Sequence, residues 1–125
     1  MIDSSPYIFA FFKAFILTFL TEYVVFSLLN RNVRALRSAV AVLMANIFSL
    51  TIIWFLFAYT IRENLAYIFL SELFAIVSES VILIVLSSIS CKRGFLSAVT
   101  MNLTSFFLGS VLLGYLFQHA GIVTL

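Results

Sequence analysis

Four polar residues inside long apolar runs are the side chains of this sequence best suited to chemistry. Glu22 and Glu79 carry carboxyl groups, and Asn46 and Asn102 carry amides that could donate hydrogen bonds to them. An ionisable residue in such a run typically marks an ion pathway or a proton relay, because it is costly to bury there. We therefore predict an ion- or proton-binding site from these four residues. Nearby hydroxyl groups could support it: Thr21, Ser49, Ser78 and Ser105.

A purely structural role for the same residues is the alternative. Hydrogen bonds between glutamate and asparagine can hold membrane helices together without binding any solute. Two buried carboxyl groups would be a costly way to do so, since asparagine or serine alone would serve.

Lys13 and Glu72 form a second candidate pair, with opposite charges at similar predicted depth. A buried ion pair is the expected arrangement, because an unpaired charge at that depth is expensive. The lysine could instead extend its ammonium group toward the lipid headgroups. Glu72 and Glu79 share one helical face, so this face could line a polar path.

Several functional classes find no support in the motifs. The sequence has no glycine-rich phosphate loop, and its single histidine, His119, has no partner at the spacing of a metal site. One cysteine, Cys91, excludes an intramolecular disulfide. We expect no metal, no cofactor and no enzymatic activity, although an intramembrane enzyme that uses glutamate alone stays an alternative. A net charge of +2 does not indicate a nucleic-acid partner.

Composition identifies the environment in which these residues must act. Of 125 residues, 64% are hydrophobic and 10% charged, and the mean hydropathy is +1.22. A soluble domain of this size could not hide that much apolar surface. A spanning helix needs about 20 mostly apolar residues. We predict an all-α integral membrane domain over 1–125 with four spans: Tyr7–Asn30, Ser38–Thr60, Leu65–Ser87 and Phe95–Phe117.

The basic residues predict the orientation of these spans. The breaks at 31–37 and 88–94 carry most of the lysine and arginine, whereas the middle break has only Arg62 beside Glu63. Basic loops stay in the cytoplasm. We therefore expect both termini outside the plasma (inner) membrane and loops 31–37 and 88–94 inside. Tyrosine, which favours the headgroup level, lies at the outer helix ends: Tyr7, Tyr59, Tyr67 and Tyr115.

The polar residues also indicate an internal repeat. A shift of 57 residues aligns Glu22 with Glu79, and a shift of 56 aligns Asn46 with Asn102. At 1.5 Å per residue, all four lie roughly 12 Å inside the cytoplasmic ends. We predict two tandem helical hairpins, at about 7–60 and 65–117, which form a parallel repeat around a pseudo-twofold axis along the membrane normal.

These observations favour a small transporter or channel for an ion, a proton or another small solute. Four helices enclose little space, so we expect a homo-oligomer if a wide pore is needed. The alternative is a non-catalytic membrane subunit that docks a partner membrane protein and uses the polar residues for structure. In both cases the four helices are embedded in the lipid bilayer.

Overall fold

The chain is built from helices that follow its four apolar runs. A computed structural model describes residues 4–119, with the side chains of 4–112 and of Tyr115. No strand occurs among the described residues, and four helices are long and apolar enough to cross a membrane. These findings confirm the predicted all-α class and the presence of four apolar helices that are long enough to span a membrane. The elements are α1 (Ser5–Leu29), α2 (Ala35–Ile52), the π-helical turn η1 (Ile53–Phe57), α3 (Ala58–Thr60), α4 (Asn64–Ser87) and α5 (Cys91–His119).

The connections are shorter than the sequence predicted. Residues 30–34, 61–63 and 88–90 link the helices, so α2 begins at Ala35 and α5 at Cys91, inside the breaks expected at 31–37 and 88–94. Arg37 and Arg93 therefore lie in the first turns of helices. Their charge led us to expect both arginines in loops. In the structure they donate hydrogen bonds to the ends of neighbouring helices instead.

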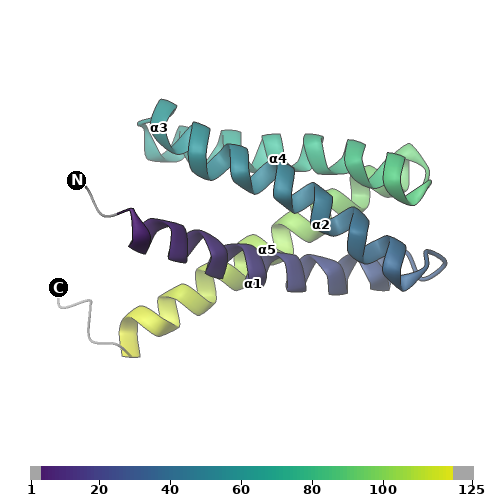
Figure 1. Ribbon diagram of the computed structural model, residues 1–125, viewed down its shortest axis with the longest axis horizontal. Helices are drawn as coiled ribbons and strands as arrows, with labels where there is room; N and C mark the ends of the chain where they lie inside the picture. The colour runs from purple at the N-terminus through teal and green to yellow at the C-terminus, as the bar shows by residue number, and fades with distance from the viewer. Residues whose placement is uncertain (1–3, 120–125) are drawn as a thin grey trace.

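The helices form a ring in which each packs against two others. Extensive contacts join α1 to α2, α2 to α4, α4 to α5 and α5 to α1. Helices α1 and α4 therefore lie diagonally across the ring. Loops 30–34 and 88–90 lie at one end, which we call the arginine end, and α1 begins and α5 ends at the other (Figure 1).

The hydrophobic core lies in the half of the ring nearest the arginine end. It contains one large aromatic residue, Phe26, with smaller aliphatic residues and a methionine around it. Its other members are Ala41, Val42, Leu83, Ile89, Ala98 and Met101. Apart from Ile89, which lies in loop 88–90 itself, these residues lie along the helices between the Glu/Asn level and the loops 30–34 and 88–90. This half of the bundle is therefore closely packed.

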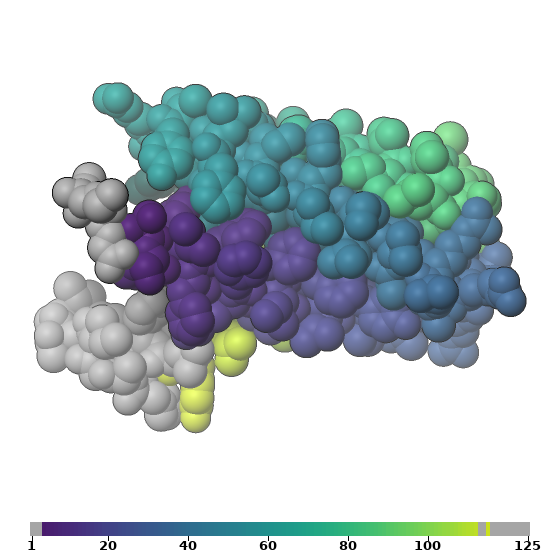
Figure 2. All heavy atoms as spheres, viewed as in Figure 1, coloured from purple at the N-terminus to yellow at the C-terminus, as the bar shows by residue number. Residues whose placement is uncertain are grey.

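The outward faces of the helices are apolar. Phe12, Leu20 and Val81 are each more than half exposed, and many other large apolar side chains are similarly placed. Figure 2 shows side chains of α1 and α2 meeting along one face of the molecule. Water would penalise so extensive an apolar surface, whereas lipid tails accept it. The surface agrees with the membrane location that the composition indicates.

A π-helical turn interrupts the second long helix between α2 and α3. Such wide turns occur mostly as single interruptions of α-helices, frequently at functional sites. The hydroxyl of Tyr7 donates a hydrogen bond of 2.6 Å to the backbone oxygen of Trp54 within this turn. The bond connects the first turn of α1 to η1 and fixes the backbone from which the Trp54 side chain projects.

Candidate functional site

The carboxyl group of Glu22 is buried at the centre of the ring and accepts a hydrogen bond on each oxygen. Asn46 Nδ2 on α2 donates to Oε2 at 2.8 Å, and Ser105 Oγ on α5 donates to Oε1 at 2.9 Å. Glu22 and Asn46 are completely shielded from solvent. Both donors come from helices that flank α1 in the ring, so the carboxyl group ties α1 to each neighbour.

The carboxyl group of Glu79 is bound in the same manner from the opposite side. Asn102 Nδ2 on α5 donates to Oε2 at 2.7 Å, and Ser49 Oγ on α2 donates to Oε1 at 2.5 Å. Glu79 is 1% exposed. Each asparagine also donates to the backbone oxygen four residues earlier on its own helix, which fixes the orientation of the amide.

The donors follow a crossed pattern. Each glutamate takes an amide from the helix that follows it in sequence and a hydroxyl from the other pair of helices. Helix α2 therefore donates to Glu22 from Asn46 and to Glu79 from Ser49, which lies one helical turn after Asn46. In the same way, helix α5 donates to Glu79 from Asn102 and to Glu22 from Ser105. Neither carboxyl group obtains both donors from its own pair of helices.

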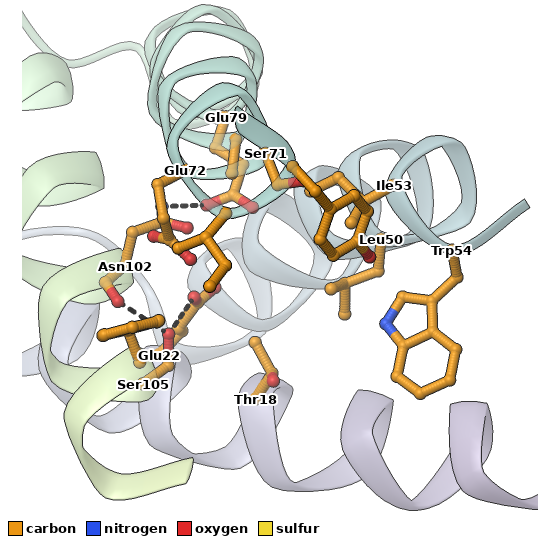
Figure 3. Close-up of a pocket in the computed structure, with 14 residues that line it drawn as sticks. Thr18, Glu22, Leu50, Ile53, Trp54, Ser71, Glu72, Glu79, Asn102 and Ser105 are labelled. Carbon is orange, nitrogen blue, oxygen red and sulfur yellow. Dashed lines mark hydrogen bonds between the residues drawn. The ribbon is translucent and has the colours of Figure 1, made fainter. Parts of the chain in front are cut away.

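A cavity of about 220 Å³ lies against this network, on the side away from the arginine end. Figure 3 shows Glu22, Glu79 and Glu72 around it, with dashed hydrogen bonds at the glutamate level. All four spans contribute to its wall. Thr18 comes from α1, Leu50 from α2, Trp54 from η1, Ser71 from α4 and Phe106 from α5. The two buried carboxyl groups form the inner end of the cavity.

The hydrophobic core lies on the opposite side of the network, between it and a depression of about 480 Å³ at the arginine end that Asn32, Arg37 and Ser87 help to line. Phe26 and Leu83, one turn beyond Glu22 and Glu79, are fully buried in the hydrophobic core. The glutamates can therefore be approached from the cavity side, while packed side chains close the path toward the arginine end.

The structure brings together most, but not all, of the residues that the sequence singled out. Glu22, Asn46, Glu79 and Asn102 lie at one level, and the hydroxyls of Ser49 and Ser105 bind the carboxyl groups. The other two hydroxyls do not join this network. Ser78 donates instead to backbone oxygens of its own helix, at Phe74 and Ala75, and Thr21 makes no hydrogen bond to either glutamate within the described residues.

The expected ion pair between Lys13 and Glu72 is not formed within the described part of the chain. Lys13 is exposed, and its ammonium nitrogen lies 4.6 Å from the centroid of the Phe9 ring. Glu72 is half-buried and lines the cavity. Lys13 precedes Glu22 by nine residues, about two and a half helical turns, so it lies on the opposite face of α1. The two residues have similar depths in the membrane, but their side chains point in different directions around the helix axes, so the predicted ion pair does not form.

Sequence reasoning missed the cavity wall. Thr18, Trp54, Tyr67 and Ser71 line the cavity but were not predicted as site residues. Two of them left a usable signal, because Thr18 and Ser71 lie four and eight residues before Glu22 and Glu79 and so fall near the same helical faces. The sequence offers no such signal for Trp54, because the π-helical turn changes the direction in which its side chain would be expected to point.

At the arginine end, two side chains repeat the crossed pattern. Arg37 on α2 donates to Leu86 O and to Ser88 Oγ, both at 2.8 Å. Arg93 on α5 donates to Asn32 Oδ1 at 2.9 Å and to Leu29 O at 3.4 Å. Each guanidinium thereby binds the carboxyl end of a helix from the other pair, where a positive charge is favourable.

Comparison with known proteins provides no relative from which a function could be transferred. No family model matches the chain, and neither a curated protein nor a solved structure matches it.

Proposed function

We propose that this chain is a small multi-pass membrane protein that binds a cation or a proton at Glu22 and Glu79 and transfers it across the bilayer. One observation carries the proposal: two buried carboxyl groups, set at one level by paired donors, form the inner end of a cavity. A network that served only to join helices would need no cavity beside it. The described side chains that line this cavity include no lysine, arginine or histidine.

An unused acceptor at the same level supports this function. The Oδ1 atom of Asn46 is buried and has no hydrogen-bond partner among the described residues. A buried acceptor without a partner is costly. A protonated carboxyl group, or a water molecule that accompanies a cation, could donate to it. The site therefore has a buried acceptor that no donor of the described network reaches.

The one-sided cavity favours a transporter over an open pore. The core around Phe26 and Leu83 closes the path toward the arginine end. Transfer across the bilayer would then require a second conformation in which that half opens. The crossed donors suggest how this could occur, because tilting one pair of helices against the other would change two hydroxyl bonds and keep both amide bonds.

The finer architecture belongs to the same proposal. We propose that α1 with α2 and α4 with α5 are tandem hairpins of one duplicated unit, which the matched donors of Glu22 and Glu79 support. We also propose that the termini lie outside the plasma (inner) membrane, that the arginine end lies in the cytoplasm, and that the chain is not an enzyme. Assembly as a homo-oligomer would be compatible with the exposed apolar faces.

One observation supports the alternative of a non-catalytic membrane subunit. Each carboxyl oxygen already accepts a hydrogen bond from a neighbouring helix, as it would in a structural tie. A partner membrane protein would then cover part of the apolar surface. This alternative predicts that loss of the carboxyl groups weakens the fold or the complex and changes no flux.

Flux in proteoliposomes separates the two functions. We expect proton or cation flux with the unaltered chain and none with the Glu22→Gln/Glu79→Gln variant, provided that the variant retains its helicity and elutes as one species. Glu63→Gln is the matched control, because Glu63 caps α4 through backbone bonds from Leu65 and Ala66 and lies outside the cavity. Equal flux from the double variant and the unaltered chain would refute the proposal.

A further inference from the structure

The cavity next to the glutamates is larger than an inorganic ion requires. At about 220 Å³ it exceeds the roughly 30 Å³ that one water molecule occupies in the liquid several times over. Pockets for drug-sized ligands usually measure about 300–1,000 Å³. The cavity therefore suits a ligand of only a few heavy atoms.

Charge restricts the class of that ligand. Glu22, Glu79 and Glu72 all line the cavity, and the described lining contains no basic side chain. Among nearby basic residues, Lys13 lies on the exposed face of α1. Arg62 lines a separate depression at the end of the bundle, although that depression shares Trp54 and Tyr67 with the cavity. A cationic ligand would bring a counter-charge to these acidic groups, which a neutral or anionic ligand would not.

The surroundings of the carboxyl groups are unsuited to a bare metal ion. No three of the acidic, cysteine and histidine side chains in the described chain converge so that they could hold one. At Glu22 and Glu79 the adjacent groups are N–H and O–H donors, which compete with a cation for the carboxyl oxygens. A metal ion would instead need further oxygen acceptors around it.

The rest of the wall is suited to an organic cation. Trp54, Tyr67 and Phe106 contribute aromatic rings, and tryptophan and tyrosine attract ammonium groups through their π faces. A further polar group lines the cavity: Ser71 is 7% exposed, its hydroxyl is buried without a hydrogen-bond partner among the described residues, and Tyr67 lies one helical turn before it. That hydroxyl is a buried polar group to which a ligand could bind.

We propose that the cavity binds a small organic ammonium ion, with Glu72 as its counter-charge and the rings of Trp54 and Tyr67 against its alkyl groups. The inference rests on the proposed function, because it names the class of substrate for the same site. Glu72 has no role in the Glu/Asn network, and its half-buried position on the cavity wall gives it one here.

Trp54 supplies the readout, since it is the single tryptophan of the chain. The experiment uses the full chain in lipid vesicles and titrates choline, its neutral isostere 3,3-dimethylbutan-1-ol, and sodium chloride. We expect a saturable change of Trp54 fluorescence with choline, and none with the alcohol or with sodium at the same concentration. Equal responses to choline and the alcohol would overturn the proposal, because the cavity would then recognise only apolar shape.

Two variants test the named contacts. Glu72→Gln should weaken choline binding at least about tenfold, because it removes the counter-charge of the quaternary ammonium group. Ser71→Leu should abolish binding by filling the cavity while all three glutamates remain. Glu63→Gln, which also removes one carboxyl group, should bind choline as the unaltered chain does. Normal choline binding by folded Glu72→Gln and Ser71→Leu proteins would refute the assignment.

The outcomes for this inference and for the proposed function are distinguishable. Glutamate-dependent flux of protons or sodium, combined with no choline response, would overturn the ammonium site and leave transport intact. A choline response that depends on Glu72, combined with no flux of choline or inorganic ions, would support the ammonium site and refute transport.

Discussion

Replacing Glu22 with glutamine should leave the fold almost unchanged, and the hydrogen bonds explain why. A glutamine oxygen can accept from Asn46 Nδ2, and the glutamine NH₂ can then donate to Ser105 Oγ. The Ser105 hydroxyl keeps an acceptor, because the backbone oxygen of Asn102 lies 3.1 Å away. Every group at Glu22 therefore keeps a partner, and we expect a loss of less than about 0.5 kcal/mol in the free energy of unfolding.

Removing the same side chain to alanine should cost considerably more. Glu22→Ala deletes the bonds from Asn46 and Ser105, at 2.8 and 2.9 Å. Hydrogen bonds between membrane helices are worth about 0.6 kcal/mol on average and up to about 1.7 kcal/mol. Two such bonds give an expected loss of about 1–3.5 kcal/mol, to which the new space in the centre of the ring adds.

Glu79 should respond differently to the same conservative change. Ser49 donates to Glu79 Oε1, and the structure gives this hydroxyl no second acceptor among the described residues. In Glu79→Gln the NH₂ group must face either Ser49 or Asn102, so one donor is displaced. We expect Glu79→Gln to lose about 0.6–1.7 kcal/mol, the value of one interhelical bond, and thus more than Glu22→Gln.

The assay is reversible unfolding in mixed micelles, followed by circular dichroism, with each variant compared at equal detergent composition. The expected order of stability is the unaltered chain, Glu22→Gln close behind it, Glu79→Gln, and then Glu22→Ala. If Glu22→Gln were as unstable as Glu22→Ala, Ser105 would not use its second acceptor, and the reasoning from the crossed network would be refuted.

Two further predictions concern packing and orientation. Gly94→Ala should destabilise the chain by about 1–3 kcal/mol in the same assay, because the new Cβ would collide with Ile84 Cγ1 and lie 3.3 Å from Ser80 O. The matched change Gly109→Ala meets no atom within 4 Å and should be neutral or stabilising by up to about 1 kcal/mol, so equal losses would contradict this account. Cys91 is exposed at the arginine end, so a membrane-impermeant maleimide should label it only after the membrane is opened. Labelling of intact cells would reverse the proposed orientation.

The four spans could be predicted because a membrane helix is specified by a one-dimensional property. A run of about 20 apolar residues is long enough to cross the bilayer, and polar breaks limit each run. Depth could be predicted for the same reason. Counting from the ends of the runs placed Glu22 level with Asn46 and Glu79 level with Asn102, and the structure joins both pairs.

Rotation about the helix axis limited the remaining predictions. Lys13 and Glu72 have similar depths, but Lys13 lies on the exposed face of α1 and Glu72 on the cavity wall. Ser78 precedes Glu79 by one residue, so its side chain points about 100° away, and it binds its own helix. Ser49 lies one turn after Asn46 and can therefore reach the glutamate of the other pair.

The crossed donors also have a consequence for the order in which the chain can be assembled. Glu22 belongs to the first helix, but its hydroxyl donor, Ser105, is 83 residues further along the chain. At about 5–20 residues per second, a ribosome needs roughly 4–17 s to synthesise that interval. During this time the Glu22 carboxyl group has at most one of its two donors, Asn46, which is itself made 24 residues after Glu22. Insertion machinery, a lipid headgroup or water must therefore accommodate the carboxyl oxygens until Ser105 is in place. The last helix to be made therefore completes the environment of a carboxyl group in the first.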